Sequence, residues 1–219
     1  MITWIKSNLI WTEGQKILLI LLFLMVFGWF IWKLLFLVSL IFLVCCFYFF
    51  RNPSRNCLAA HSDDTILICP ADGRVIDIQY DPHSELEGYA YKVSIFLSVF
   101  DVHVNWIPMA GTVKKIVYKP GMFMLAFLPK SSLLNECNDV VLAGKQEKTI
   151  LVRQIAGWIA RRICCWIKEG EHLTVNQKYG MIRFGSRVDT FLPDNVMLAV
   201  KKGEYVYGGQ TVLGRWICY

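Results

Sequence analysis

A long apolar stretch near the N-terminus places the strongest constraint on how this chain can fold. Ile17–Trp32 carries no charged residue, Lys33 interrupts, and Leu34–Phe50 is again uncharged. As one straight helix, residues 17–50 would be roughly 51 Å long, well beyond the ~30 Å hydrocarbon core of a bilayer. Each half alone is roughly 24–26 Å long. The stretch therefore predicts a hydrophobic hairpin of two helices that turns near Gly28–Lys33.

The flanking charges indicate how such a hairpin is oriented. A hairpin leaves Lys6 and Lys16 on the same side as Arg51 and Arg55, as the positive-inside rule prefers. We therefore expect residues 1–50 to anchor the chain in the cell membrane, with the remainder on the cytoplasmic face. The apolar region is too long for a cleaved signal peptide, and no small-x-small cleavage site follows it. A hydrophobic hairpin buried in a soluble core is the alternative.

Composition limits the partners that the chain can bind. The formal net charge of +6 suits an anionic membrane surface. No compact basic stripe with stacking aromatic residues is present, so we expect no nucleic acid partner. The eight cysteines include no CxxC pair, so the sequence shows neither a zinc site nor a disulfide framework. We expect reduced thiols that pack as small apolar side chains.

Beyond a polar linker at residues 51–64, residues 65–219 carry mostly β signals. The Pro70–Gly73 turn, between two apolar runs, predicts a hairpin or a tight corner. Ile155–Arg162 and the Leu125–Asn135 region are the only helix candidates. Short strands between frequent turns predict a mainly β domain, a compact barrel or sandwich. The expected strands are Ile66–Cys69, Arg74–Ile78, Tyr91–Leu97, Thr112–Tyr118, Thr149–Gln154, Cys164–Lys168, Gly180–Phe184 and Val196–Val200.

An internal repeat also bears on the fold. Trp166–Gln177 aligns with Ala199–Gln210, and each copy contains a Lys-x-Gly-Glu turn, a short strand and a turn that ends in Gln. The pattern resembles the strand-turn-strand halves of biotinyl- and lipoyl-type barrels. It has no Met-Lys-Met or Asp-Lys-Ala tip, so it carries information on fold and little on function.

The segment Gly180–Asp189 places a Gly-Ser bond inside a run that alternates like a β-strand. It is no hydrolase elbow, because Val188 follows where Gly-x-Ser-x-Gly needs a glycine. Glycine leaves its carbonyl open to approach, so the hydroxyl of Ser186 could attack the carbonyl carbon of Gly185. The resulting ester, after β-elimination and hydrolysis, would leave a pyruvoyl group, a covalent cofactor that needs no external source.

Serine is a weak nucleophile at neutral pH and needs a positioned base. His103 lies in an otherwise apolar stretch, where a histidine can equally be a satisfied core residue. Asp72 lies in the Pro70–Gly73 turn, where an aspartate commonly caps its own backbone. Local sequence alone leaves both residues as candidates.

Several motifs occur together in one order. Their combination resembles the proenzymes of phosphatidylserine decarboxylases, specifically the short, membrane-anchored (type A) members, over residues 50–219. The stretches that carry the resemblance are Pro70-Ala-Asp72-Gly73, Asp101-Val-His103-Val-Asn-Trp-Ile-Pro108, Pro120-Gly-Met-Phe, Asn135-Glu-Cys-Asn138, Gln154-Ile-Ala-Gly and Arg183-Phe-Gly185-Ser186-Arg-Val-Asp189.

The resemblance implies a specific activity. Cleavage between Gly185 and Ser186 would give chains 1–185 and 186–219, which stay together as a heterodimer that could form a higher oligomer. A pyruvoyl group made from Ser186 would bind the amino group of phosphatidylserine as a Schiff base and accept electrons as CO₂ leaves. The product would be phosphatidylethanolamine. By the family's pattern His103 deprotonates Ser186, and Asp72 orients His103.

Two residues depart from the family's pattern. Longer members carry a second histidine where this chain has Trp106, and short members usually carry arginine where it has Cys137. Arg161, Arg162 and Arg187 are the remaining candidates to bind the lipid phosphate, because guanidinium pairs bidentately with phosphate oxygens. A solvated basic face near the membrane explains these arginines equally well.

Two other functions stay open at this stage. One is a decarboxylase of a related serine-headgroup lipid, such as the archaeal ether lipid archaetidylserine. The other is a membrane-anchored β-barrel without enzymatic activity that binds a lipid and leaves the Gly185–Ser186 bond uncut.

Overall fold

The computed structural model describes residues 11–80, 88–122, 124, 134–145, 148–157, 162–183 and 185–217. The chain forms two compact units, which divide at residue 54.

The first unit is a pair of apolar helices, α2 (Trp11–Ile31) and α3 (Lys33–Phe49). The chain turns at Trp32, whose N–H donates to the carbonyl of Gly28 over 2.9 Å, so the turn expected at Gly28–Lys33 is confirmed. Gly28 allows the helices to approach, because a Cβ there would lie 2.5 Å from the backbone N of Phe36. By length and composition, Glu13–Ile31 is the one helix among the described residues that could cross a membrane.

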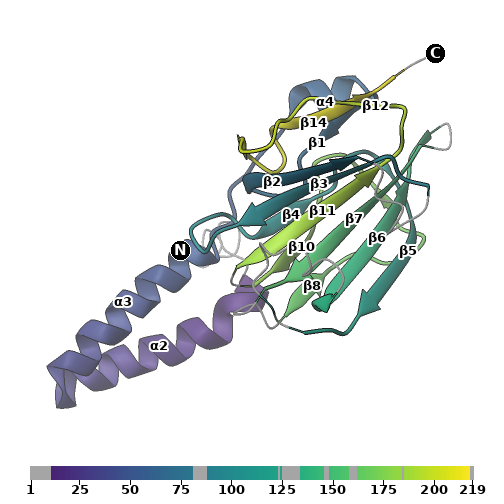
Figure 1. Cartoon of the computed structure of the whole chain (residues 1–219). Coiled ribbons are helices and arrows are strands. Elements are labelled where there is room, and N and C mark those ends of the chain that lie inside the picture. Colours follow the sequence, from purple (N-terminus) through teal and green to yellow (C-terminus); the bar gives the residue numbers. More distant parts are fainter. Residues whose placement is uncertain are drawn as a thin grey trace. The chain divides into compact units, whose positions relative to one another are not determined.

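The second unit contains a short helix and three antiparallel sheets (Figure 1). The helix α4 spans Leu58–Ser62. One three-stranded sheet has the order β1 (Ile66–Ile68), β14 (Val212–Trp216), β12 (Val196–Leu198), and the other has β4 (Val104–Trp106), β10 (Lys178–Ile182), β8 (Ile163–Cys165). The large sheet has the order β13 (Tyr205–Val206), β2 (Gly73–Tyr80), β3 (Tyr91–Leu97), β11 (Ser186–Leu192), β7 (Thr149–Ala156), β6 (Cys137–Ala143), β5 (Gly111–Lys119), β9 (His172–Leu173).

The hydrophobic core lies between the large sheet and the two small ones. It joins side chains from all three, among them Val75, Ile95 and Val188 of the large sheet with Leu67, Leu213, Tyr179 and Ile182 of the small sheets. This arrangement is sandwich-like and not a closed barrel. The expected mainly β fold is confirmed, in its sandwich form.

The internal repeat forms the two edges of the large sheet. Both turns have the same structure: the N–H of Lys168 donates to the carboxylate of Glu171 over 3.0 Å, and that of Lys201 donates to Glu204 over 3.0 Å. The short strand after each turn is β9 in one copy and β13 in the other, and these are the outermost strands of the sheet. The repeat therefore supplies both edge strands of the large sheet.

Two sequence expectations resolve differently. The Pro70–Gly73 turn is a tight corner between sheets and not a hairpin, because β1 pairs with β14 whereas β2 pairs with β3 and β13. The helix expected at Ile155–Arg162 is wrong at its start, since Ile155 and Ala156 end β7. Residues 158–161 and 125–133, which include most of the other expected helix, lie outside the described residues.

Candidate active site

Two connections between the sheets bring His103 to the Gly-Ser bond. β3 pairs with β11 in the large sheet, and β4 pairs with β10 in a small sheet. The β3–β4 connection, which carries His103, therefore passes from one sheet to the other beside the β10–β11 connection, which carries Gly185. A backbone hydrogen bond from Ile182 N–H to the carbonyl of His103, 3.3 Å long, holds the two together.

His103 is fully buried, and both of its ring nitrogens have a backbone neighbour. Nε2 lies 3.3 Å from the backbone N of Gly185, and Nδ1 lies 3.0 Å from the carbonyl oxygen of Asp101. Because Gly185 N–H can only donate, Nε2 is the acceptor and Nδ1 carries the proton. The unprotonated nitrogen, which can act as a base, thus faces the peptide that precedes Ser186.

Ser186 is the first residue of β11, paired with Leu97 on one side and Ala156 on the other. Its side chain is fully buried, and its Oγ has no hydrogen-bond partner among the described residues. A buried hydroxyl without a partner is costly. Gly185 has a φ of +67°, which favours glycine. The site therefore places a buried hydroxyl that lacks a hydrogen-bond partner next to the carbonyl of Gly185, a residue without a side chain.

Asp72 is buried as well, but its hydrogen bonds go elsewhere. Its carboxylate pairs with both terminal nitrogens of Arg55, one of them at 2.7 Å, and it accepts the backbone N–H of Gly208 over 2.8 Å. Arg55 also lies 5.0 Å from the ring centroid of Trp106. The Nδ1 of His103 is therefore held by the backbone carbonyl of Asp101, while Asp72 joins Arg55 to the C-terminal segment.

The carboxylate of Asp101 holds the turn in front of His103. It accepts hydrogen bonds from the N–H and the hydroxyl of Ser98, at 2.7 and 2.8 Å, and from the hydroxyl of Tyr205 at 2.5 Å. Burial, and then this hydrogen bond to Asp101, raise the pKa of the Tyr205 phenol. We had not predicted Asp101, Arg55 or Tyr205 as site residues. The Ser-x-x-Asp spacing could have indicated the turn at Asp101, whereas no local pattern indicates the other two.

A comparison with known families decides which chemistry this site performs. A model of the phosphatidylserine decarboxylase family matches residues 42–214, well over half of the chain. The chain belongs to that family. The enzyme is a pyruvoyl-dependent lyase that decarboxylates phosphatidylserine to phosphatidylethanolamine.

The arginines expected to bind phosphate lie in different environments. Arg187 is buried and pairs with Asp189, with its Nε 2.6 Å from Oδ1. Because successive side chains of a strand point to opposite faces, Arg187 and Ser186 project from opposite faces of the sheet. Arg162 is exposed, and its carbonyl accepts the N–H of Arg183 over 3.2 Å, beside the connection to Gly185. Arg161 lies outside the described residues.

The two positions that depart from the family's pattern are both buried. Trp106 is fully buried, and its Nε1 has no hydrogen-bond partner among the described residues. Cys137 lies in β6 with its thiol among buried groups, and burial, followed by the charge of Asp139, raises its pKa. The indole of Trp106 can only donate a hydrogen bond, and the thiol of Cys137 supplies no positive charge, so neither can act as the expected histidine or arginine would.

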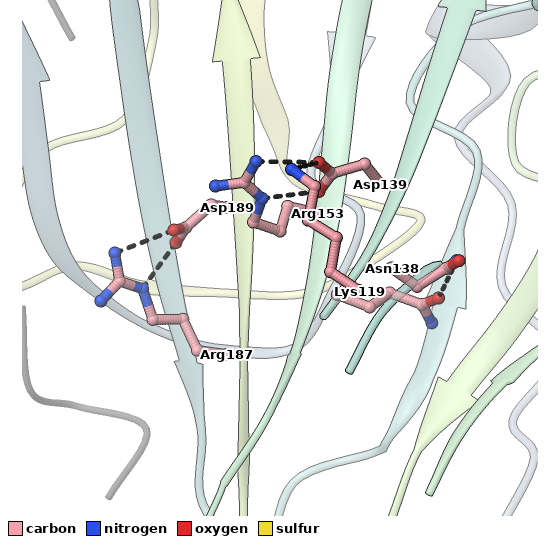
Figure 2. Close-up of polar contacts among 7 residues, drawn as sticks. Lys119, Asn138, Asp139, Arg153, Arg187 and Asp189 are labelled. Atoms are coloured by element: carbon pink, nitrogen blue, oxygen red, sulfur yellow. Dashed lines mark hydrogen bonds and ion pairs between the residues drawn. The ribbon is translucent and has the colours of Figure 1, made fainter. Parts of the chain in front are cut away.

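A row of ion pairs crosses the face of the large sheet opposite to Ser186 (Figure 2). Arg187 faces Asp189. The guanidinium of Arg153 donates hydrogen bonds to both carboxylate oxygens of Asp139, at 2.5 and 2.8 Å. Burial alone would lower the pKa of Arg153, but the hydrogen bond and charge of Asp139 raise it. All four groups are almost fully buried. The Arg153–Asp139 pair joins β7 to β6, whereas the Arg187–Asp189 pair lies within β11.

Proposed function

We propose that this chain matures by cutting itself between Gly185 and Ser186, with His103 as the base. The observation that carries the proposal is the buried, partnerless Oγ of Ser186 next to a peptide whose N–H lies on Nε2 of His103. Transfer of the serine proton to Nε2 would let Oγ attack the carbonyl carbon of Gly185. The acyl group then moves from nitrogen to oxygen, which gives an ester.

The ester breaks by β-elimination, in which the Gly185 carboxylate leaves and dehydroalanine remains at position 186. Hydrolysis of dehydroalanine releases ammonia and leaves the pyruvoyl group at the start of the chain 186–219. When formed, this group supplies the electron sink for the loss of CO₂.

We further propose supporting roles for three charged residues. Asp72 acts as a positioning residue that fixes Arg55 and Gly208, and so keeps the C-terminal chain in place after the cut. Arg162 is exposed beside the segment that leads to Gly185, and it would bind the lipid phosphate. Arg187, held by Asp189, would serve the sheet rather than the lipid.

We propose that the enzyme is of the short, membrane-anchored (type A) kind, with its catalytic unit on the cytoplasmic face. Large apolar side chains of both helices are exposed, among them Phe23, Phe30 and Phe42 at 66%, 79% and 58%. Such exposure disfavours a hairpin buried in a soluble core. The two chains 1–185 and 186–219 would remain together as a heterodimer.

Intact-mass analysis of the purified protein tests the proposal. We expect two chains, with the smaller one blocked at its N-terminus by the pyruvoyl group. Ser186→Ala should stay uncut and release no CO₂. Thr190→Val is a matched control, because Thr190 lies on the same face of β11 and its buried hydroxyl also lacks a partner among the described residues. An uncut parent chain with full decarboxylase activity would refute the proposal, as would active Ser186→Ala.

A further inference from the structure

The turn between β3 and β4 carries exposed apolar side chains beside the site. Val99 is 39% and Phe100 is 70% exposed. β3 ends at Leu97, which is the register partner of Ser186. Consecutive Cα atoms are about 3.8 Å apart, so Phe100 lies at most about 11 Å along the chain from that partner. The apolar tip therefore belongs to the Ser186 end of the large sheet.

Hydrogen bonds fix the end of this turn that leads to His103. Asp101 accepts two hydrogen bonds from Ser98, and its carbonyl lies against Nδ1 of His103. One short turn therefore presents Phe100 outward and fixes the base inward.

Two tyrosines extend the apolar surface. Tyr205, which donates a hydrogen bond to Asp101, is 40% exposed, and Tyr207 is 50% exposed. Their ring centroids lie 5.1 Å apart. Tyrosine rings prefer the headgroup level of a bilayer, where the ring is apolar and the hydroxyl stays hydrated. We call Val99, Phe100, Tyr205 and Tyr207 the apolar rim.

We propose that the apolar rim docks on a phospholipid leaflet and brings a lipid headgroup from the bilayer to Ser186. The proposal rests on the proposed role of Ser186. A leaflet is the expected partner of the rim because the substrate is a lipid. Its reacting carboxylate lies at the headgroup, while its acyl chains stay in the bilayer. A surface that receives this substrate must contact the leaflet close to the reacting residue, and the rim combines exposed apolar and tyrosine side chains there.

A kinetic comparison tests this surface with the full chain. The rate of phosphatidylethanolamine formation is measured per pyruvoyl-blocked chain, on phosphatidylcholine vesicles that contain phosphatidylserine and on monomeric dihexanoyl phosphatidylserine. Phe100→Ser should lower the vesicle-to-monomer rate ratio roughly tenfold, as expected from the loss of one buried aromatic side chain. Tyr80→Ser is the control, because Tyr80 is also 70% exposed but pairs with Tyr91 at the other end of β3. An unchanged ratio for Phe100→Ser would overturn the proposal.

A second measurement does not depend on activity. With p-benzoylphenylalanine in place of Phe100, illumination on the same vesicles should attach lipid to the chain that contains residue 100, whereas the same group in place of Tyr80 should not. Attachment to protein alone, or no attachment, would overturn the proposal. If the parent chain stays uncut and inactive, the proposed function fails, and cross-linking still decides whether the rim meets a leaflet.

Discussion

Nε2 of His103 accepts the backbone N–H of Gly185 over 3.3 Å, so the proposed base contacts the residue that precedes Ser186. The N···N separation is at the long end of hydrogen-bond geometry, and such a bond is weak. The hydroxyl of the next residue, Ser186, has no hydrogen-bond partner among the described residues. Under the proposed mechanism, the imidazole therefore already lies beside the peptide that precedes Ser186.

This geometry predicts the behaviour of histidine variants. His103→Ala should slow self-cleavage by roughly 10²–10⁴-fold, the usual loss for a general base. His172→Ala should cleave at the parent's rate, because His172 is exposed at the sheet edge, where its Nδ1 lies 3.3 Å from Thr112. Gel quantification of the two chains during expression measures both. Cleavage of His103→Ala at the parent's rate would exclude His103 as the base.

Gly185 permits a second, conformational test. A Cβ at Gly185 would meet no atom within 4 Å, but its φ is +67°, so Gly185→Ala should cost about 1–2 kcal/mol from backbone strain alone. Gly203 has a φ of +88° and equally open surroundings, so Gly203→Ala should cost a similar amount. Only Gly185→Ala should slow the cut, since only it alters the carbonyl under attack. Equal cleavage of the two variants, matched in thermal stability, would contradict this role.

Arg55 should matter for both stability and maturation. Arg55→Met leaves Asp72 as a buried carboxylate with only the Gly208 N–H, a change that typically costs about 3–5 kcal/mol. Arg55→Lys keeps the charge but loses the bidentate geometry, so we expect an intermediate loss. Urea unfolding measures the cost. If both variants match the parent, Arg55 does not position Asp72.

Regular patterns in the sequence predicted much of the fold. The two Lys-x-Gly-Glu turns formed as expected because glutamate binding to the turn backbone is local, and both Gly170 and Gly203 adopt the positive φ that the turn needs. The apolar stretch at residues 17–50, which Lys33 interrupts, turned near Gly28, where only a glycine lets α2 meet Phe36 so closely. In each case the information lies within a few residues.

The strand that carries Ser186 was harder to predict. We expected one strand at Gly180–Phe184 and none that begins at Ser186. In the structure β10 ends at Ile182, and a separate strand, β11, begins at Ser186. Arg187 and Asp189 gave β11 the pattern of a half-exposed strand, although all of its residues are buried, because the two charges pair with each other. The Arg55–Asp72 pair was missed since it joins distant segments. Burial of paired charges and long-range contacts are properties of the folded chain that no local pattern contains.

The buried row of ion pairs predicts a contrast in stability. Asp139→Asn removes the partner of a buried arginine, Arg153, and should cost about 3–5 kcal/mol. Asp77→Asn removes a pair with Lys202 that is largely exposed, and should cost about 0–1 kcal/mol. Urea unfolding of the two variants measures both values. Similar costs for the two would mean that the buried row does not stabilise the sheet.

Tyr205 should give the enzyme an alkaline transition of its own. Burial and then the hydrogen bond and charge of Asp101 raise the pKa of Tyr205. A raised pKa contributes stability that is fully present below the ordinary tyrosine pKa of about 10 and is lost as pH rises through the higher value in the folded protein. We therefore expect the difference in thermal stability between the parent and Tyr205→Phe to be constant below pH ~10 and to shrink above it.

Ionised tyrosine absorbs near 295 nm, so absorbance at about this wavelength follows the ionisation of Tyr205 directly. Burial also raises the pKa of Tyr179, so the signal of Tyr205 is taken as the difference between the parent and Tyr205→Phe. Asp101→Asn should move that signal to lower pH, because the amide keeps a hydrogen-bond acceptor but removes the negative charge that opposes ionisation. A difference signal in the range of an ordinary tyrosine, unaffected by Asp101→Asn, would show that Tyr205 does not hold the carboxylate in front of His103.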